Sequence, residues 1–174
     1  MKRILTILLS LLATLIIGIV IGMGAMLIAY PYIFPPPVLN EKVVHVASKK
    51  VFSIGTFIHP NPSDPIHYGK GNVSIYRSNT NQYEVFLHDN FLVGPGPAFH
   101  VYLVENKDIK DNRDFKKAVK YDLGMLKSFR GSQVYKIPEH INMKDIQSVV
   151  VWCKSFSQLI TSANLNHGEK ASKH

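Results

Sequence analysis

The chain has 174 residues, a formal net charge of +8 and a single cysteine. This length predicts one domain of ordinary size, and one cysteine excludes an intramolecular disulfide. The basic residues are dispersed and many lie near acidic ones, which argues against the clustered basic surface of a nucleic-acid-binding protein. We therefore expect a solvated basic surface and no nucleic-acid partner.

An apolar stretch, interrupted only by Thr6, Ser10 and Thr14, occupies most of the first 33 residues. Lys2 and Arg3 precede residues 4–29, which contain no charged side chain. Crossing a bilayer takes about 20 apolar residues, whereas a cleavable signal peptide needs only about 7–15. We predict a single transmembrane anchor over residues 1–33, although its glycines keep cleavage open as an alternative. The two basic residues should stay in the cytoplasm, which places the rest of the chain outside it.

A run of three prolines at positions 35–37 should end this helix and stiffen the segment after it. We expect a proline-rich linker over residues 34–44 and a folded domain over residues 45–165. Residues 166–174 are mostly polar and are expected to form a tail.

The domain reads as a series of short strands separated by turn residues. Runs rich in β-branched and aromatic residues occur at 51–59, 73–77, 83–88, 99–104, 121–126, 133–137, 148–154 and 158–162. Several of them alternate apolar and polar positions, as half-buried strands do. This spacing predicts an all-β domain, an antiparallel β-sandwich or a barrel-like fold, after the N-terminal transmembrane helix.

Two segments depart from this pattern. Residues 105–120 are highly charged and do not alternate, so we expect a long surface loop with room for one helical turn. Such a loop either recognises a partner or is a tolerated insertion. Residues 148–153 are the most apolar run, which predicts a central strand covered on both faces.

Cys153 is the residue that most restricts the chemistry. In an oxidising compartment it would be a buried inert thiol, a metal or haem ligand, a reactive thiol, or half of an intermolecular disulfide. The sequence contains no Cys-x-x-Cys, which excludes dithiol exchange within the chain and covalent c-type haem attachment. The residues after Cys153 also lack the closely following His and Met of a familiar blue-copper loop.

No arrangement of residues supports an enzyme. The six histidines between positions 45 and 140 form no closely spaced pair with metal-ligand spacing, so the metal content stays open. His59, His88 and His100 lie near strand ends and could converge in space. The sequence has neither a Gly-x-Ser-x-Gly elbow nor a phosphate-binding loop.

A series of segments, in order, resembles the DM13 domain family. They are GTF at 55–57, HYGKGNVSIY at 67–76, NF at 90–91, GPGPAFHVYL at 94–103, DLGMLK at 122–127, GSQVYKIP at 131–138, SVVVWCKSFS at 148–157 and ANL at 163–165. The resemblance covers residues 45–165. It implies electron transfer by a characteristic cysteine that corresponds to Cys153, acting as a bare thiol or as a ligand to a group such as haem.

The resemblance adds two further candidates beside the cysteine. His100 and Trp152 lie in the segments that resemble the family and are candidates, with Cys153, for binding a cofactor, either haem or a metal. Members of the family occur beside DOMON domains, and this sequence shows none, so we expect a redox partner protein in trans. The competing hypothesis is a ligand- or protein-binding module of the adhesion type in which Cys153 only packs in the core.

Overall fold

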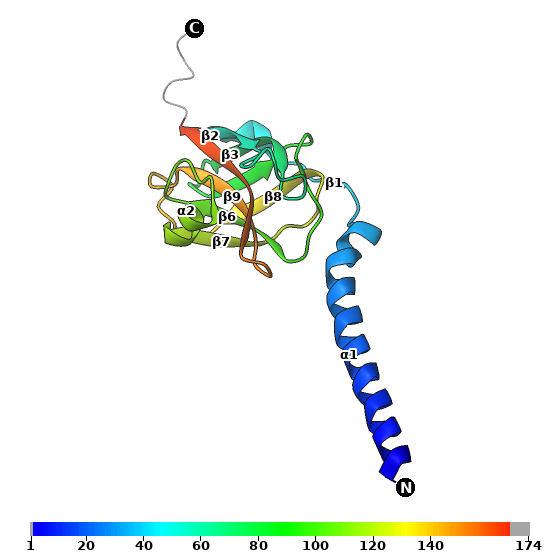
Figure 1. The fold of residues 1–174 in the computed structure, drawn as a ribbon. Coiled ribbons are helices and arrows are strands. Elements are labelled where there is room, and N and C mark those ends of the chain that lie inside the picture. The colour runs from blue at the N-terminus through cyan, green and yellow to red at the C-terminus, as the bar shows by residue number, and fades with distance from the viewer. Residues whose placement is uncertain (1, 168–174) are drawn as a thin grey trace. The chain divides into compact units, whose positions relative to one another are not determined.

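The computed structural model describes residues 2–167, and the chain divides into two compact units between Pro35 and Pro36. The first unit is helix α1, Lys2–Ile33 (Figure 1). Its large apolar side chains are exposed along the whole helix, and the mean hydropathy of its most apolar stretch is 3.0. The helix is long and apolar enough to cross a membrane, which supports a membrane anchor.

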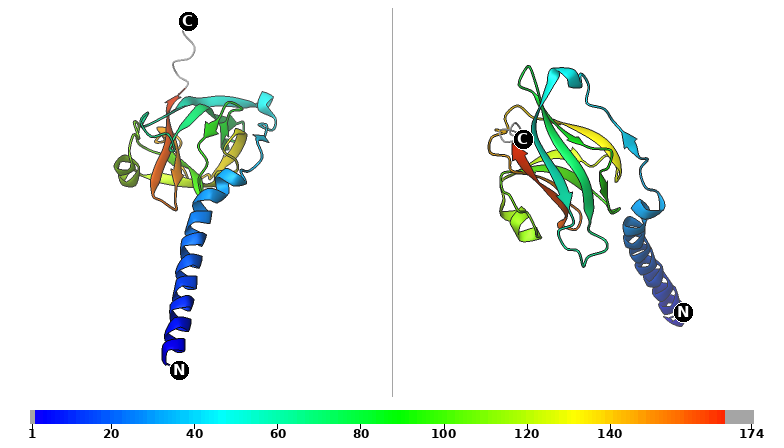
Figure 2. Two further views of the ribbon diagram at one scale, coloured as in Figure 1. Left: turned by 45° about the vertical axis from the view of Figure 1, so that its right-hand side comes forward. Right: turned by 90° about the horizontal axis from the view of Figure 1, so that it is seen from above.

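The second unit is a curled sheet of ten strands that forms a half-barrel (Figures 1 and 2). The strands are β1 (Leu39–Asn40), β2 (Lys49–Ile58), β3 (Gly69–Ser78), β4 (Tyr83–Leu87), β5 (Leu92–Val93), β6 (Phe99–Val104), β7 (Lys120–Met125), β8 (Gly131–Ile137), β9 (Ser148–Cys153) and β10 (Gln158–His167). Two short helices are η1 (Val46–Ser48) and α2 (Asn112–Lys117). The prediction of an all-β, barrel-like domain after an N-terminal helix is confirmed.

The strand order around the sheet is β1-β8-β4-β3-β2-β10-β9-β6-β7, and β5 pairs separately with β3. Every pairing is antiparallel except that of β1 with β8. Because β7 stands at one end of this order, its outer edge has no strand partner within residues 2–167. The functional candidates lie on β6, which pairs with β7, and on β9, the next strand in the sheet.

Alternation along the strands explains the core. Val101 and Leu103 of β6 point inward and are fully buried, as are Val85 and Leu87 of β4. Strand β9 lies between β10 and β6, and all six of its residues are buried. This confirms the expectation that 148–153 is covered on both faces.

The two faces of β9 belong to two different clusters. Its inward residues join the main core inside the curled sheet, while Val150 and Trp152 join a smaller cluster on the outer face. Helix α2, in the charged segment expected to be a loop with one helical turn, supplies Phe115 to that outer cluster. The side chain of Asp111 caps this helix by accepting from the N–H groups of Arg113 and Asp114. The segment is therefore anchored to the domain by a buried aromatic side chain.

The structure also contains strands that the sequence did not indicate. β1 and β5 have two residues each, and β10 continues to His167 instead of ending near residue 162. Strand β1 comes from the segment expected to be a linker. Of the expected tail, residues 168–174 lie outside the part of the chain that the structure describes.

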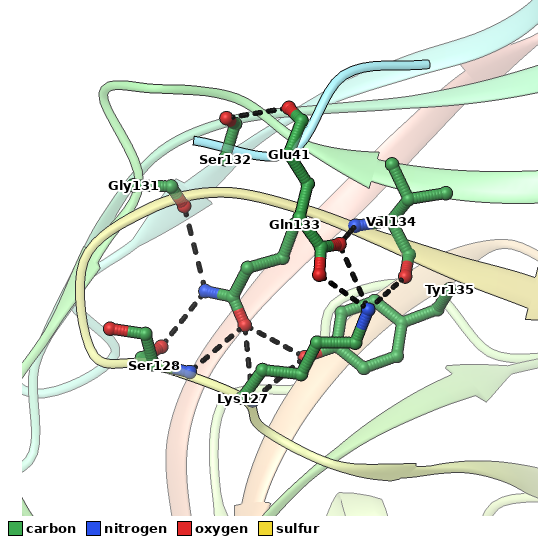
Figure 3. Close-up of polar contacts among 8 residues, drawn as sticks. All are labelled: Glu41, Lys127, Ser128, Gly131, Ser132, Gln133, Val134 and Tyr135. Carbon is green, nitrogen blue, oxygen red and sulfur yellow. Dashed lines mark hydrogen bonds and ion pairs between the residues drawn. The ribbon is translucent and has the colours of Figure 1, made fainter. Parts of the chain in front are cut away.

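A buried glutamine organises the turn before β8, as Figure 3 shows. Gln133 is fully buried, and its Oε1 accepts from the backbone N–H of Lys127 and of Ser128 at 3.1 Å and from the Tyr135 hydroxyl at 2.8 Å. Its Nε2 donates to the Ser128 carbonyl at 2.8 Å. One side chain thus satisfies several polar groups that would otherwise be buried without partners.

The segment around β1 is held to β8 by Glu41 (Figure 3). Its carboxylate accepts from Lys127 Nζ at 2.8 Å and from the Val134 N–H at 2.7 Å, and its backbone carbonyl accepts from the Ser132 hydroxyl. Burial by itself would raise the pKa of Glu41, but these hydrogen bonds outweigh it and hold the pKa below its usual value.

Candidate functional site

Cys153 is the last residue of β9 and lies under the loop that precedes β6. Its side chain is 1% exposed, and its Sγ donates a hydrogen bond to the Pro97 carbonyl at 3.2 Å. The backbone of this covering loop is fixed by the Lys154 N–H, which donates to the Ala98 carbonyl at 3.0 Å. The loop at residues 94–99, GPGPAF, which resembles a segment of the family, therefore covers the cysteine sulfur.

The surroundings of Sγ keep the thiol protonated at neutral pH. Burial raises the pKa of Cys153, and the backbone N–H groups of Phe156 and Ser155 in the following turn oppose that effect only in part. A reactive cysteine normally has the opposite arrangement, with partial exposure and a lowered pKa. Cys153 is consequently a poor nucleophile in this conformation.

His100 and Trp152 lie next to Cys153 in the sheet but on its other face. Across the pairing of β6 with β9, Phe99 lies opposite Cys153 and His100 lies opposite Trp152. Residues directly opposite one another point to the same side, and successive residues of a strand point to opposite sides. The structure thus brings His100 and Trp152 together on the outer face and places the Cys153 sulfur inside.

On the outer face, His100 belongs to a hydrogen-bonded cluster centred on Asp122 of β7. His100 Nδ1 lies 2.9 Å from Asp122 Oδ1, while Lys154 Nζ and the Tyr102 hydroxyl lie 3.0 Å and 3.1 Å from Oδ2. The Gly124 N–H also donates to Oδ1, at 2.9 Å. One carboxylate thus receives hydrogen bonds from three strands or strand ends.

These contacts fix the charge of the cluster. Partial burial would raise the pKa of Asp122, but the hydrogen bonds from His100, the Gly124 N–H and Lys154 lower it to about 2. Burial and the nearby Asp122 carboxylate raise the pKa of Tyr102 to about 12. Near neutral pH the cluster therefore holds an ionised carboxylate that can only accept hydrogen bonds, beside a neutral phenol.

A bulge in β7 produces this arrangement. The register between β6 and β7 shifts between Val101 and Tyr102, so that Val101 lies opposite Gly124 while Tyr102 lies opposite Asp122. Gly124 adopts a φ of 112°, which an L side chain would strain, and its N–H turns back to the Asp122 carboxylate. Asp122 was not among the candidates predicted from the sequence, although Asp-Leu-Gly within an expected strand is a signal for such a bulge.

Trp152 is packed against helix α2. It is 6% exposed, and its ring stacks on Phe115 of α2 with centroids 4.2 Å apart and an interplanar angle of 22°. Phe115 in turn meets the Tyr102 ring edge-on at 5.1 Å. The indole therefore has a structural role as the centre of the outer cluster.

The other histidines do not join His100. His88 Nε2 lies 2.8 Å from the Ser74 hydroxyl, and His59 Nε2 lies 2.8 Å from the Asp64 carbonyl, so each of these rings has its own local partner. Within residues 2–167, no three side chains of His, Cys, Asp and Glu come together in a way that could hold a metal ion.

Comparison with known families shows a match to the family model described as "Electron transfer DM13" over residues 62–165. The chain belongs to the DM13 family. The DM13 match covers more than half of the chain and includes Cys153, His100, Trp152 and Asp122, which confirms the resemblance seen in the sequence. No curated protein and no solved structure matches the chain.

Proposed function

We propose that this chain is a membrane-anchored, extracytoplasmic electron-transfer domain whose redox centre is Cys153. The observation that carries the proposal is the DM13 match, which spans both the covering loop and the strand end that enclose the sulfur. Helix α1 is the anchor, with Lys2 and Arg3 on the cytoplasmic side. A redox partner protein in trans supplies or removes the electrons.

The environment of the sulfur is compatible with such a role, although not with thiol exchange. A dry surrounding with fixed dipoles adjusts the redox potential of a buried group and keeps water away from it. Sγ lies between the Pro97 carbonyl and the N–H groups of the turn after β9. This shell shields the sulfur from attack by other thiols, whether it acts as a bare sulfur or as a ligand to a bound cofactor such as haem or a metal.

A second function is favoured by the burial of Cys153. Its 1% exposure, its place in the main core and its raised pKa are also those of an inert packing residue. The domain would then be a binding module, in which the charged segment around α2 recognises a partner.

One experiment separates the two functions. The full chain is purified in detergent, without reductant, from an extracytoplasmic compartment, and its native mass and its thiol alkylation are measured. Additional mass that matches haem or a metal and disappears in Cys153→Ser supports electron transfer. A bare polypeptide mass, with Cys153 alkylated only after denaturation, contradicts a bound cofactor and favours the binding module.

A matched variant controls for loss of stability. Val151→Ala removes a buried side chain from the same face of β9 and leaves the sulfur in place. We expect it to weaken folding by about 1–3 kcal/mol while it retains any bound group. Loss of the group in both variants would mean that the core, and not the sulfur, retains it. The intact mass from the same preparation also shows whether the anchor helix is retained or cleaved.

A further inference from the structure

The outer face carries an exposed methionine that packing does not explain. The sequence has five methionines: three at positions 1, 23 and 26, before or within α1; Met143, buried in the main core; and Met125. Met125 ends β7, beside the open edge of the sheet, and is 62% exposed. A thioether in that position contributes little to stability and is free to contact a ligand.

Met125 lies directly opposite His100 in the pairing of β6 with β7. Residues opposite one another in an antiparallel pair point to the same side, with Cβ atoms about 4.5–5.5 Å apart. Since His100 is on the outer face, Met125 projects from the same face, and its flexible thioether is long enough to reach the imidazole. On the other side of β6, Trp152 of β9 lies opposite His100.

The imidazole of His100 is oriented as metal-binding histidines are. Its Nδ1 lies 2.9 Å from Asp122 Oδ1, and a carboxylate at this ring nitrogen favours the tautomer that has its proton on Nδ1 and its lone pair on Nε2. No hydrogen bond to Nε2 is formed within the described residues. A carboxylate that holds the second nitrogen of a histidine is the usual support for a metal ligand. Asp122 is held in turn by Lys154 and by the Gly124 N–H.

From these observations we infer that His100 Nε2 and Met125 Sδ form a binding site for monovalent copper, Cu(I), on the outer face of β6 and β7. Thioether and imidazole are the ligands that select Cu(I), whereas magnesium, calcium and manganese prefer oxygen. A structural zinc site would need four ligands, and the Asp122 oxygens are already engaged. Cu(I) accepts low coordination numbers, so two protein ligands hold it and leave a position open toward solvent.

This inference goes beyond the proposed function and does not depend on it. The site uses neither the sulfur of Cys153 nor the covering loop, since both lie on the other side of the β6–β9 pairing. Copper bound here would still bind if Cys153 were only a packing residue.

The test is a titration of the full chain in detergent with Cu(I), kept reduced by ascorbate, against a chromophoric Cu(I) chelator. We expect one Cu(I) per chain, and at least a tenfold loss of affinity in Met125→Leu and in His100→Gln. His88→Gln and His59→Gln, each of which changes an imidazole elsewhere in the domain, are the matched controls and should retain the affinity of the unmodified chain. Unchanged affinity in Met125→Leu, or copper lost only in Cys153→Ser, overturns the inference.

X-ray absorption at the copper edge gives a readout that a general loss of folding would not imitate. The unmodified chain should show one sulfur and one imidazole nitrogen bound to copper, and Met125→Leu should lose only the sulfur. Asp122→Asn tests the positioning role of the carboxylate and should lower the affinity about 10–100-fold while both ligand atoms stay bound. A copper neighbourhood of nitrogen and oxygen alone in the unmodified chain refutes the site.

Discussion

Replacement of Gln133 by leucine tests whether the buried amide holds the turn before β8 in place. The substitution keeps a side chain of similar size and removes every hydrogen bond of the amide shown in Figure 3. The Lys127 N–H retains the Tyr135 hydroxyl, 3.1 Å away, as a partner. The N–H and the carbonyl of Ser128, a residue that is 1% exposed, lose the partner that Gln133 provides.

The magnitude follows from these two backbone groups. A buried polar group left without a partner costs about 1–3 kcal/mol, so the pair costs about 2–6 kcal/mol, and the Tyr135 hydroxyl loses its acceptor as well. Burial of the apolar leucine side chain offsets part of this destabilisation. We therefore expect the free energy of unfolding to fall by about 3 kcal/mol in total. Because domains of this size are stable by about 5–15 kcal/mol, the variant should fold and show a clearly lower urea midpoint.

The measurement uses the fluorescence of Trp152, which is the only tryptophan and is buried in the domain. The full chain in detergent micelles is unfolded with urea, and Gln133→Leu is compared with Gln82→Leu. Gln82 is exposed and its side chain makes only a 3.5 Å contact with Glu139, so this control should stay within about 0.5 kcal/mol. A loss below about 1 kcal/mol in Gln133→Leu, or equal losses in both variants, would refute the assigned role of the amide.

Three further predictions concern the outer cluster and the loop over the sulfur. The pKa of Asp122 is about 2 in the folded chain, below its unfolded value of 3.8, so its contribution to stability is present above pH 4 and is lost as the pH falls toward 2. Asp122→Asn should therefore flatten the dependence of unfolding free energy on pH in that window, and an unchanged slope would contradict the assignment. Gly96→Ala should destabilise the domain strongly, because its new methyl group would lie 2.4 Å from the Phe99 ring. Ala98→Gly should stabilise the domain by up to about 1 kcal/mol, because glycine relieves the strain of a φ of 48°. Urea midpoints of the two variants that shift in the same direction would refute this. Phe115→Ala should cost about 3–5 kcal/mol and change the emission of the tryptophan on which it stacks, and a native-like spectrum would show that the stack is not formed.

The strands that could be predicted are those in which alternation coincides with strongly apolar residues. Residues 99–104 were predicted with the bounds of β6, because inward Val and Leu there alternate with amphipathic side chains. The second half of β10 was not predicted, although Ala163 and Leu165 are buried. Small side chains and asparagines there differ too little in hydrophobicity for the alternation of buried and exposed positions to be recognised in the sequence. β1 and β5 are too short to show any period, and only their pairing with β8 and β3 defines them.

The outer cluster could not be predicted because the partners of Asp122 are distant in the sequence. His100 and Lys154 meet it only through the order of β7, β6 and β9 in the sheet and through the bulge that shifts their register. The sequence did indicate His100 and Trp152 as candidates, but it could not show on which face of the sheet each lies relative to Cys153. That face follows from the register of β6 with β9 and from the division of the β9 residues between the main core and the outer cluster.

This separation of faces leads to a last prediction, on the double variant of Cys153→Ser and Met125→Leu. The inward sulfur and the outward thioether share no hydrogen-bond partner, and the two positions lie on opposite faces. Substitutions at independent sites add within about 0.3–0.5 kcal/mol, so the double-mutant cycle in urea unfolding should give a coupling energy near zero. A coupling above about 1 kcal/mol would mean that the two faces are linked through the strand, and the copper and cysteine hypotheses would then describe one site.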